Sequence, residues 1–339
     1  MATIKEIADL AGVSRGTVDR VLNKRGSVNQ STADKIIEIA KILDYKPNRA
    51  GIVLAAQKKK IKIGVVLFGV GNPFFDEVIL GIENKAEEFA NYNCTIILKR
   101  ISLGVKEQLD ALDELLAEEV NGIALSPYND KQIADKIDAL SSNGIPVVTL
   151  NTDIENAKRL AYVGSNYFHS GQTAAGLMRL ITHGQVNVGI ITGSENVLCH
   201  TERIAGFKKN IEQNYPNITI TDTIFHNDDE FESYDLTSKL LTNHPEINAL
   251  FFAAGGVYGG CRAVLSKNRQ SDLKIITFDS IDTTKELLHN DVIAATICQH
   301  PFEQGTKPLD ILFTYLITGE LPKQELNYVE VDIRIRENI

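Results

Sequence analysis

The sequence of 339 residues has few cysteines, no CxxC pair and no long uninterrupted apolar segment. Scattered cysteines indicate reduced thiols and argue against a disulfide framework or a structural zinc site. The longest apolar run, residues 61–70, is interrupted by Lys62 and two glycines and is far shorter than the ~20 residues of a transmembrane helix. Because Met1 leads directly into a helical pattern without an apolar signal region, we expect a cytoplasmic protein with no membrane segment. The cysteines are Cys94, Cys199, Cys261 and Cys298.

Motifs of the common nucleotide-dependent and hydrolytic enzymes are also missing. The chain has no GxxxxGK[ST] phosphate-binding loop, no GxSxG nucleophile elbow and no HExxH pattern among its histidines. Gly69 and Gly71 follow an apolar run as a phosphate loop would, but the third glycine of GxGxxG is absent and Pro73 follows. We therefore expect no catalytic residues, no cofactor and no metal ion.

Charge is distributed unevenly along the chain. Residues 1–60 contain 12 Lys and Arg against 6 Asp and Glu, a net charge of +6, whereas the remaining residues contain 23 against 38, a net charge of −15. A basic segment on an acidic body is typical of a nucleic-acid-binding module joined to a different domain. Because the acidic body should repel DNA, we expect DNA contacts to be confined to the N-terminal segment.

Residues 3–23, TIKEIADLAGVSRGTVDRVLN, predict two short helices joined by a tight turn. Thr3 and Glu6 form a capping box at the start of the first helix, and Gly12 ends it because glycine adopts the left-handed conformation at low cost. Ser14 caps the second helix. This arrangement is a helix-turn-helix, whose second helix lies in the DNA major groove. The apolar residues at helical spacing are Ile4, Ile7, Ala8, Ala11, Val18, Val21 and Leu22.

The outward face of the second helix carries groups suited to reading DNA. Arg15, Gly16 and Thr17 open this helix, and Arg20 follows one turn after Gly16. Arginine makes bidentate contacts to the edge of guanine. A solvated helical face is the alternative interpretation of these arginines.

A third helix is expected to complete a small bundle. Ser31 is its expected N-cap with Asp34 in the box position, and the basic loop before it, residues 24–28, suits phosphate contact. The apolar stripe of this helix is Ile36, Ile39, Ala40 and Leu43.

This three-helix head and the DYKPNRAG that follows it resemble the lactose-repressor (LacI/GalR) family of bacterial transcription regulators. The resemblance implies that Arg15, Gly16 and Arg20 lie where the family reads bases. It also implies that a homodimer or a higher oligomer binds a palindromic operator, with one head in each half-site. The residues expected to contact DNA are Thr3, Ser14, Arg15, Gly16, Thr17, Arg20, Asn23, Arg25, Asn48, Arg49, Leu54 and Ala55.

Residues 48–56 match the hinge segment of this family, which folds into a helix on the operator. The resemblance implies that Leu54, followed by Ala55, wedges into the minor groove and kinks the DNA. The alternative is that Leu54 is a linker residue that touches the core. The hinge departs from the family pattern at residues 51–53, Gly-Ile-Val, which are weak helix formers. A helix there should need DNA and a partner chain to form.

From residue 61 onward, short apolar runs alternate with helical patterns, which predicts parallel sheets covered on both faces. The series is too long for one sheet and divides near residues 162–164, so we expect an α/β core of two doubly wound subdomains with a ligand cleft at the carboxyl ends of their strands. Strands are expected at residues 62–68, 95–99, 122–126, 146–151, 186–192, 218–225, 249–253, 274–278 and 294–297. Helices are expected at residues 72–90, 105–118, 131–142, 170–182, 203–213, 233–242, 257–267 and 283–289.

This core resembles the effector-binding core of the same family, which is similar to periplasmic sugar-binding proteins. The resemblance implies three crossings between the subdomains, near Gly164, near residues 299–301 and near residues 321–327. The expected division is a DNA-binding domain at 1–47, a hinge at 48–60 and a core at 61–339. In that core, the first subdomain takes about 61–163 and 298–322, and the second about 164–297 and 323–339.

Polar and aromatic residues follow the ends of the expected strands. Two aromatics and an amide in NPFF can sandwich the apolar face of a sugar and bond its hydroxyls, and this motif matches the sugar-binding motif of the family. By resemblance, Arg203 in HTERIAGF is the ligand arginine, Asp279 in ITFDS an acceptor carboxylate, and Gln299 a crossover ligand residue. The expected effector residues are Asn72, Phe74, Phe75, Tyr128, Asn129, Asn151, Arg203, Tyr258, Asp279 and Gln299.

Individually, these residues have ordinary structural alternatives. Phe75 can be a core residue, Arg203 a surface charge, and Asp279 a helix cap. The sequence also departs from the family at residues 254–258, AGGVY, where an Asn-Asp pair is usual, so that backbone NH groups or Tyr258 would have to substitute. Asn129 replaces an aspartate common in sugar binders.

The function predicted from these features is a DNA-binding transcriptional regulator, expected to be a repressor, whose operator affinity is controlled by a small sugar or polyol. A purine or nucleoside effector is the alternative, because Phe74 and Phe75 could stack a base, and a sugar acid or phosphate is another. A transport protein for sugars would lack the DNA-binding head, and an enzyme is not expected.

Overall fold

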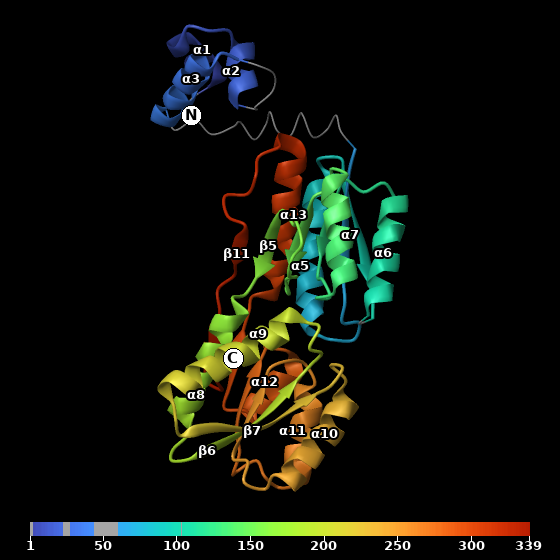
Figure 1. The fold of residues 1–339 in the computed structure, drawn as a ribbon, viewed down its shortest axis with the longest axis vertical. Coiled ribbons are helices and arrows are strands. Elements are labelled where there is room, and N and C mark those ends of the chain that lie inside the picture. Colours follow the sequence, from blue (N-terminus) through green and yellow to red (C-terminus); the bar gives the residue numbers. More distant parts are fainter. Residues whose placement is uncertain (1–2, 23–27, 44–59, 103) are drawn as a thin grey trace.

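A computed structural model describes residues 3–22, 28–43, 60–102 and 104–339. It contains a three-helix head and, as the sequence predicted, a core of two α/β subdomains; the sheet of each subdomain has six strands (Figure 1). The DNA contacts predicted for Asn23, Arg25, Asn48, Arg49, Leu54 and Ala55 lie outside the described residues and stay predictions.

The head consists of α1 (Ile4–Ala11), α2 (Arg15–Leu22) and α3 (Gln30–Ile42). The capping box of α1 is confirmed: Thr3 N donates to Glu6 Oε2 at 2.7 Å, and Glu6 N donates to Thr3 Oγ1 at 3.2 Å. Gly12 ends α1 with φ 72°, and Ser14 Oγ accepts from the backbone N of Thr17 at 3.1 Å.

The predicted N-cap of α3 was wrong by two residues. Asn29 is the N-cap, and its Oδ1 accepts from the backbone N of Ser31 at 3.0 Å. Asparagine and serine are comparable N-caps, so the sequence alone could not separate them. The apolar stripe is confirmed, with Ile36 fully buried between the helices.

The first subdomain has a parallel sheet of strand order β11-β5-β4-β3-β1-β2. Helices α5 and α13 cover one face of this sheet, and α6 and α7 cover the other. Its strands are β1 (Ile61–Leu67), β2 (Cys94–Arg100), β3 (Gly122–Leu125), β4 (Val147–Leu150), β5 (Ala161–Gly164) and β11 (Leu326–Tyr328). Its helices are α5 (Phe74–Ala90), α6 (Val105–Ala117), α7 (Lys131–Ser142) and α13 (Pro301–Thr318).

The second subdomain has strand order β12-β10-β9-β8-β6-β7, parallel except for β12. Helices α8 and α9 pack on one face and α10, α11 and α12 on the other. Its strands are β6 (Val186–Thr192), β7 (Ile218–Phe225), β8 (Ala249–Phe252), β9 (Lys274–Phe278), β10 (Ala295–Cys298) and β12 (Asp332–Arg334). Its helices are α8 (Tyr167–Ile181), α9 (Leu198–Asn214), α10 (Glu230–Asn243), α11 (Val257–Ser266) and α12 (Asp282–His289).

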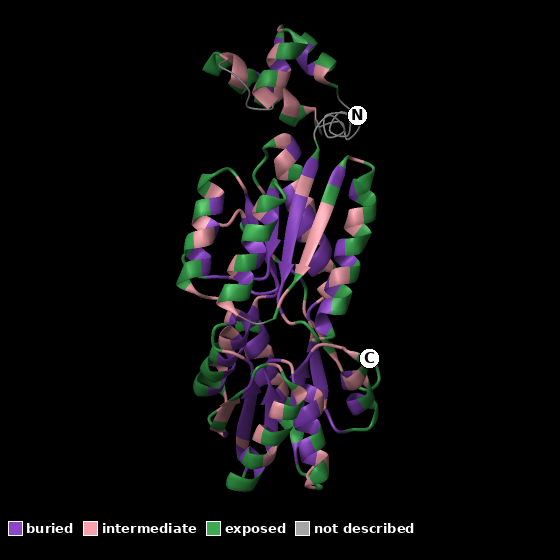
Figure 2. Cartoon of the chain, turned by 90° about the vertical axis from the view of Figure 1, so that its right-hand side faces the viewer, coloured by how far each residue is buried: buried purple, intermediate pink, exposed green. Residues whose placement is uncertain are grey.

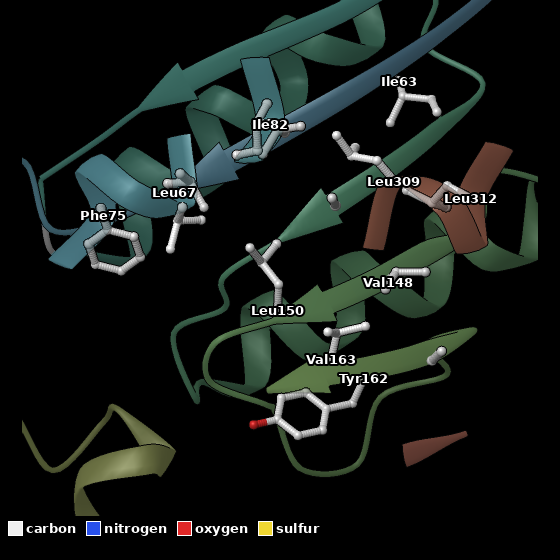
Figure 3. Packing of buried hydrophobic residues seen from close by; sticks show 14 of the residues in the cluster. Ile63, Leu67, Phe75, Ile82, Val148, Leu150, Tyr162, Val163, Leu309 and Leu312 are labelled. Carbon is white, nitrogen blue, oxygen red and sulfur yellow. The ribbon is translucent and has the colours of Figure 1, made fainter. Parts of the chain in front are cut away.

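The strands form the buried centre of each subdomain, and the helices turn their exposed sides outward (Figure 2). In the first subdomain, Ile63 and Val148 of the sheet pack with Leu309 and Leu312 of α13 (Figure 3). Each such fully buried side chain contributes about 1.5–3 kcal/mol to stability. The two sheets are therefore rigid supports for the loops that follow their strands.

The third crossing lies later in the chain than the sequence predicted. Residues Leu326–Tyr328 form β11, which pairs in parallel with β5 and so belongs to the first subdomain. The chain crosses after Tyr328 and enters β12 at Asp332. A three-residue strand is too short to show an alternating hydrophobic pattern in the sequence. Only its pairing with β5 in the structure defines it as a strand.

Candidate functional site

The exposed side of α2 has the arrangement expected of a recognition helix. Val18 is fully buried against the other helices, which turns Arg15 and Arg20 outward, both exposed. Arg20 Nε donates to Gly16 O at 3.1 Å, and Arg20 Nη2 donates to Thr17 Oγ1 at 3.4 Å. These bonds hold the guanidinium along the helix near its N-terminus.

The carboxyl edges of the two sheets meet at the junction of the subdomains. The loop after β6 reaches the loops after β3 and β4, which places the ends of three strands together. The hydrogen bonds that join the two edges include Tyr128 Oη with Ser194 Oγ (3.0 Å), Asn129 N with Asn196 O (2.8 Å), and Cys199 N with Thr152 Oγ1 (3.2 Å). The predicted Tyr128 and Asn129 therefore lie at the cleft, where Asn129 Oδ1 also accepts from Glu155 N.

Arg203 is a buried cation at this junction, with 3% of its surface exposed. Its guanidinium carbon lies 3.8 Å from the ring centroid of Phe278 and 4.7 Å from that of Tyr167. Nη1 donates to Ala253 O at 2.9 Å, whereas Nε is buried without a hydrogen-bond partner among the described residues. The surface-charge alternative for Arg203 is therefore wrong, and Nε is a donor that a bound ligand can use.

A chain of hydrogen bonds connects the other polar residues. Gln299 Nε2 donates to Asp279 Oδ1 at 2.7 Å, and Gln304 Nε2 donates to Gln299 O at 2.6 Å. Asn151 Nδ2 lies 3.3 Å from both Gln304 Oε1 and Tyr167 Oη. Gln299 Oε1 is buried and, within the part of the chain that the structure describes, accepts no hydrogen bond. The structure thus brings Asn151, Asp279 and Gln299 together beside Arg203.

The carboxyl group of Asp279 has an unusual proton affinity. Burial raises its pKa to about 6, although Arg203 and the Gln299 side chain favour the ionised form. Because an ionised carboxylate accepts hydroxyl hydrogen bonds better than a protonated one, effector affinity should rise as the pH rises through about 6. Asp279→Asn should flatten this pH dependence in calorimetric titrations; an unchanged pH profile would remove Asp279 from the ligand contacts.

The two phenylalanines of NPFF have different surroundings. Phe74 lines a cavity of about 410 Å³ together with Asp279 and Gln299. Phe75 is 2% exposed and packs edge-on against Phe68, with ring centroids 5.7 Å apart, so it belongs to the core beside Leu67 (Figure 3). Asn72 Oδ1 accepts from the backbone N of Phe74 at 3.0 Å and so shapes the start of α5.

Tyr258 is a correction to the predicted site. Its hydroxyl accepts from Arg262 at 3.3 Å, and it lines a separate depression with Tyr234 and Leu287. Residue 258 is the second residue of α11, and the helix directs this side chain toward α10 and α12, away from Arg203. Tyr258 therefore does not replace the side chains that the family carries at this loop.

Other residues at the junction were not predicted from the sequence. Tyr167 supports Arg203, and Gln304 links Asn151 to Gln299. His200 lies one turn before Arg203 in the same HTERIAGF motif, but only the fold shows that it is buried. Burial lowers the pKa of His200 to about 3, so its imidazole is uncharged. Within the described parts of the chain, no group of three or more ionisable ligands is placed to hold a metal ion.

Close packing of α8 on α9 fixes the position of Arg203. A methyl group at Gly206, three residues after Arg203, would collide with the backbone carbonyl oxygen of Phe168. We expect Gly206→Ala to destabilise the protein by about 1–3 kcal/mol, because overpacking forces the helices apart, and to weaken effector binding. The matched control is Gly176→Ala on α8, where the nearest atom, Tyr215 Oη, is 3.9 Å from the added carbon. Urea unfolding that shows equal stability for both variants would contradict this role.

Comparisons with known proteins agree with both parts of the chain. The family described as bacterial regulatory proteins, lacI family, matches residues 3–48, and the periplasmic binding protein domain matches residues 63–321. None of the helices that the structure describes has the length and apolarity that crossing a membrane requires.

Three similar proteins illustrate these matches. Catabolite control protein A of Priestia megaterium is 29% identical over 286 residues, which cover 82% of each chain. The ribose operon repressor of Halalkalibacterium halodurans is 26% identical over 98% of this chain and 94% of its own length. The structure of an ABC transporter solute binding protein from Burkholderia graminis C4D1M in complex with D-arabinose is 25% identical with a TM-score of 0.74, covering 83% of this chain and 96% of that one. Over residues 63–321 the chain therefore belongs to the periplasmic binding protein domain family, and at residues 3–48 it carries a helix-turn-helix domain of the lacI family of bacterial regulatory proteins.

Proposed function

We propose that this protein is a repressor whose operator affinity is controlled by a small sugar or polyol bound between the two subdomains. The observation that carries the proposal is the buried network around Arg203. In that network, Arg203 Nε is an unpaired donor and Gln299 Oε1 an unpaired acceptor among the described residues. Leaving such groups unpaired is costly. A ligand with hydroxyl groups, which both donate and accept, suits them together.

The ring of Phe74 and the names of the relatives support a carbohydrate. An aromatic face beside hydroxyl-binding groups suits the apolar face of a sugar. Two relatives are named for catabolite control and for a ribose operon, and a solved relative holds D-arabinose. Since the relatives are regulators, we assign no reaction to the cleft.

This proposal assigns a role to each part of the chain. Residues 1–47 bind DNA, residues 48–60 form the hinge and residues 61–339 bind the effector. A cytoplasmic homodimer places its two heads on a palindromic operator. Effector binding shifts the population of subdomain arrangements, and this shift changes how well the paired hinges hold the operator.

A thermal-shift screen of the full chain tests the ligand class. The panel contains D-ribose, D-arabinose, D-xylose, D-glucose, D-galactose, xylitol, D-glucuronate, D-galacturonate, guanosine and hypoxanthine. A ligand present at a hundred times its Kd stabilises the folded state by about 2.7 kcal/mol, which raises the melting temperature by several degrees. Stabilisation by a sugar or polyol is the expected result. Stabilisation by purines alone would replace the sugar proposal, and no stabilisation by any compound would contradict it.

A further inference from the structure

Glycines surround one carboxylate in the second subdomain, that of Asp228. The carboxyl ends of β7, β6 and β8 are neighbours in the sheet. Asp228 follows β7, while Gly193 follows β6 and Gly255 follows β8. A methyl group at Gly193 would lie 3.0 Å from Asp228 Oδ1, and one at Gly255 would lie 3.1 Å from the same atom. The missing side chains at these two positions therefore make the space that the Asp228 carboxylate occupies.

The surrounding backbone holds Asp228 in this space. Its φ is 57°, in the left-handed region that aspartate enters more readily than most residues. The backbone N of Asp228 donates to His226 Nδ1 at 2.9 Å, and Asp228 Oδ1 accepts from Gly255 N at 3.0 Å. No donor contacts Oδ2 within the described ranges, so this oxygen is free to accept from a ligand.

The histidines beside Asp228 do not neutralise it. Because His226 Nδ1 accepts a hydrogen bond, the neutral ring carries its proton on Nε2, and burial lowers the pKa of His226. His200, which lies against Gly193 as Asp228 does, is also uncharged because burial lowers its pKa. Both imidazoles therefore act here as uncharged hydrogen-bonding groups.

Arg203 is a buried cation whose charge acts on both Asp228 and Asp279. Burial raises the pKa of both carboxyl groups, whereas the charge of Arg203 favours their ionised forms. Once both carboxyl groups are ionised, two negative charges stand against one guanidinium at the carboxyl edge of the second sheet. A ligand carboxylate or phosphate placed here would meet like charge, which is costly in a buried site.

We propose that Asp228 determines effector specificity: it accepts a hydroxyl group of a neutral sugar and excludes sugar acids and sugar phosphates from the cleft. In this chain the carboxylate of Asp228, in the loop after β7, occupies space that Gly255, in the loop after β8, leaves open. The inference rests on the proposed function, since it names which carbohydrates the same cleft takes.

The test compares each neutral sugar with its acid. Affinities of the full chain are measured by calorimetry for D-glucose with D-glucuronate and for D-galactose with D-galacturonate, pairs in which CH2OH becomes a carboxylate. Asp228→Asn keeps the Oδ1 acceptor for Gly255 and removes the charge. We expect it to weaken binding of the neutral sugar about tenfold and to strengthen binding of the acid, so that the preference for the neutral sugar falls by more than about tenfold.

Two further variants separate charge from position. Gly255→Ala displaces the carboxylate without removing its charge, so neutral-sugar affinity should fall while the acid stays excluded. If the Asp228→Asn protein does not fold, Gly255→Ala tests the role of Asp228 in its place. The matched control is Asp235→Asn on the exposed side of α10, which should change neither affinity.

The outcomes distinguish this inference from the proposed function. If the wild-type protein binds no sugar of either kind, the proposed function fails. If it binds neutral sugars but Asp228→Asn and Gly255→Ala keep wild-type affinities and wild-type preference, the proposed function stands and the role of Asp228 is overturned. A wild-type protein that binds the acids more tightly than the neutral sugars also overturns it.

Discussion

Arg203→Ala should lower the affinity for the effector by about tenfold to a hundredfold. The unpaired Nε of the buried guanidinium offers a charge-assisted hydrogen bond that contributes about 1.5–3 kcal/mol, and a loss of 2.8 kcal/mol corresponds to about a hundredfold in Kd. The planar donors of arginine are held between Phe278 and Tyr167, so no other residue can replace their geometry. Calorimetric titration of the full chain with the sugar found in the screen measures the effect.

A second arginine provides the control for this prediction. Arg262 lies in the same subdomain, with its guanidinium carbon 5.9 Å from the ring centroid of Tyr258, at the depression outside the cleft. Arg262→Ala should leave effector affinity unchanged. Arg203→Ala should also leave binding of the head to operator DNA intact while the response to the sugar disappears. Wild-type effector affinity in a folded Arg203→Ala protein would remove Arg203 from the site.

Arg20→Ala should weaken operator binding by about tenfold to a hundredfold. A bidentate contact between an arginine and a guanine edge contributes about 1–3 kcal/mol of discrimination. Arg20 is exposed on α2 and is oriented by Gly16 O, so that its guanidinium lies on the face opposite the buried Val18. Fluorescence anisotropy with an operator selected by the protein from a random duplex library measures this loss.

The Arg20→Ala variant distinguishes a base contact from general electrostatic attraction to the DNA. Lys41→Ala removes a positive charge from the exposed side of α3 and serves as the control. If Arg20 reads a base, its replacement lowers specificity at one position of each half-site, and Lys41→Ala does not. Equal, sequence-independent losses for the two variants would show that Arg20 contributes only general attraction to the phosphates.

The sequence predicts elements well where local chemistry defines them. The capping box of Thr3 and Glu6 and the left-handed Gly12 are both present because each depends on neighbours within a few residues. By contrast, α13 contains Pro308 in its interior, where proline disfavours a helix, and its N-cap His300 has a φ of 47°. Packing of α13 against α5 and the first sheet overrides that local preference.

The same distinction applies to the site. The sequence predicts Arg203, Asp279 and Gln299 for the site because they follow strand ends or lie in motifs that the family shares. Nothing in the sequence points to Asp228 or Tyr167, since their positions beside Gly255 and Arg203 depend on which loops and helices meet in space. Tyr258 was misplaced for the same reason: a residue close to a strand end in sequence can still point to the opposite side of its helix.

Operator affinity measured with and without the effector tests the central claim most directly. The full chain is titrated onto its selected operator by fluorescence anisotropy, at rising concentrations of the sugar identified in the screen. We expect the operator Kd to change by about tenfold or more, since allosteric couplings of 1–3 kcal/mol are typical, and Arg203→Ala to abolish the change. A sugar that binds the cleft while the operator Kd stays the same would contradict the account.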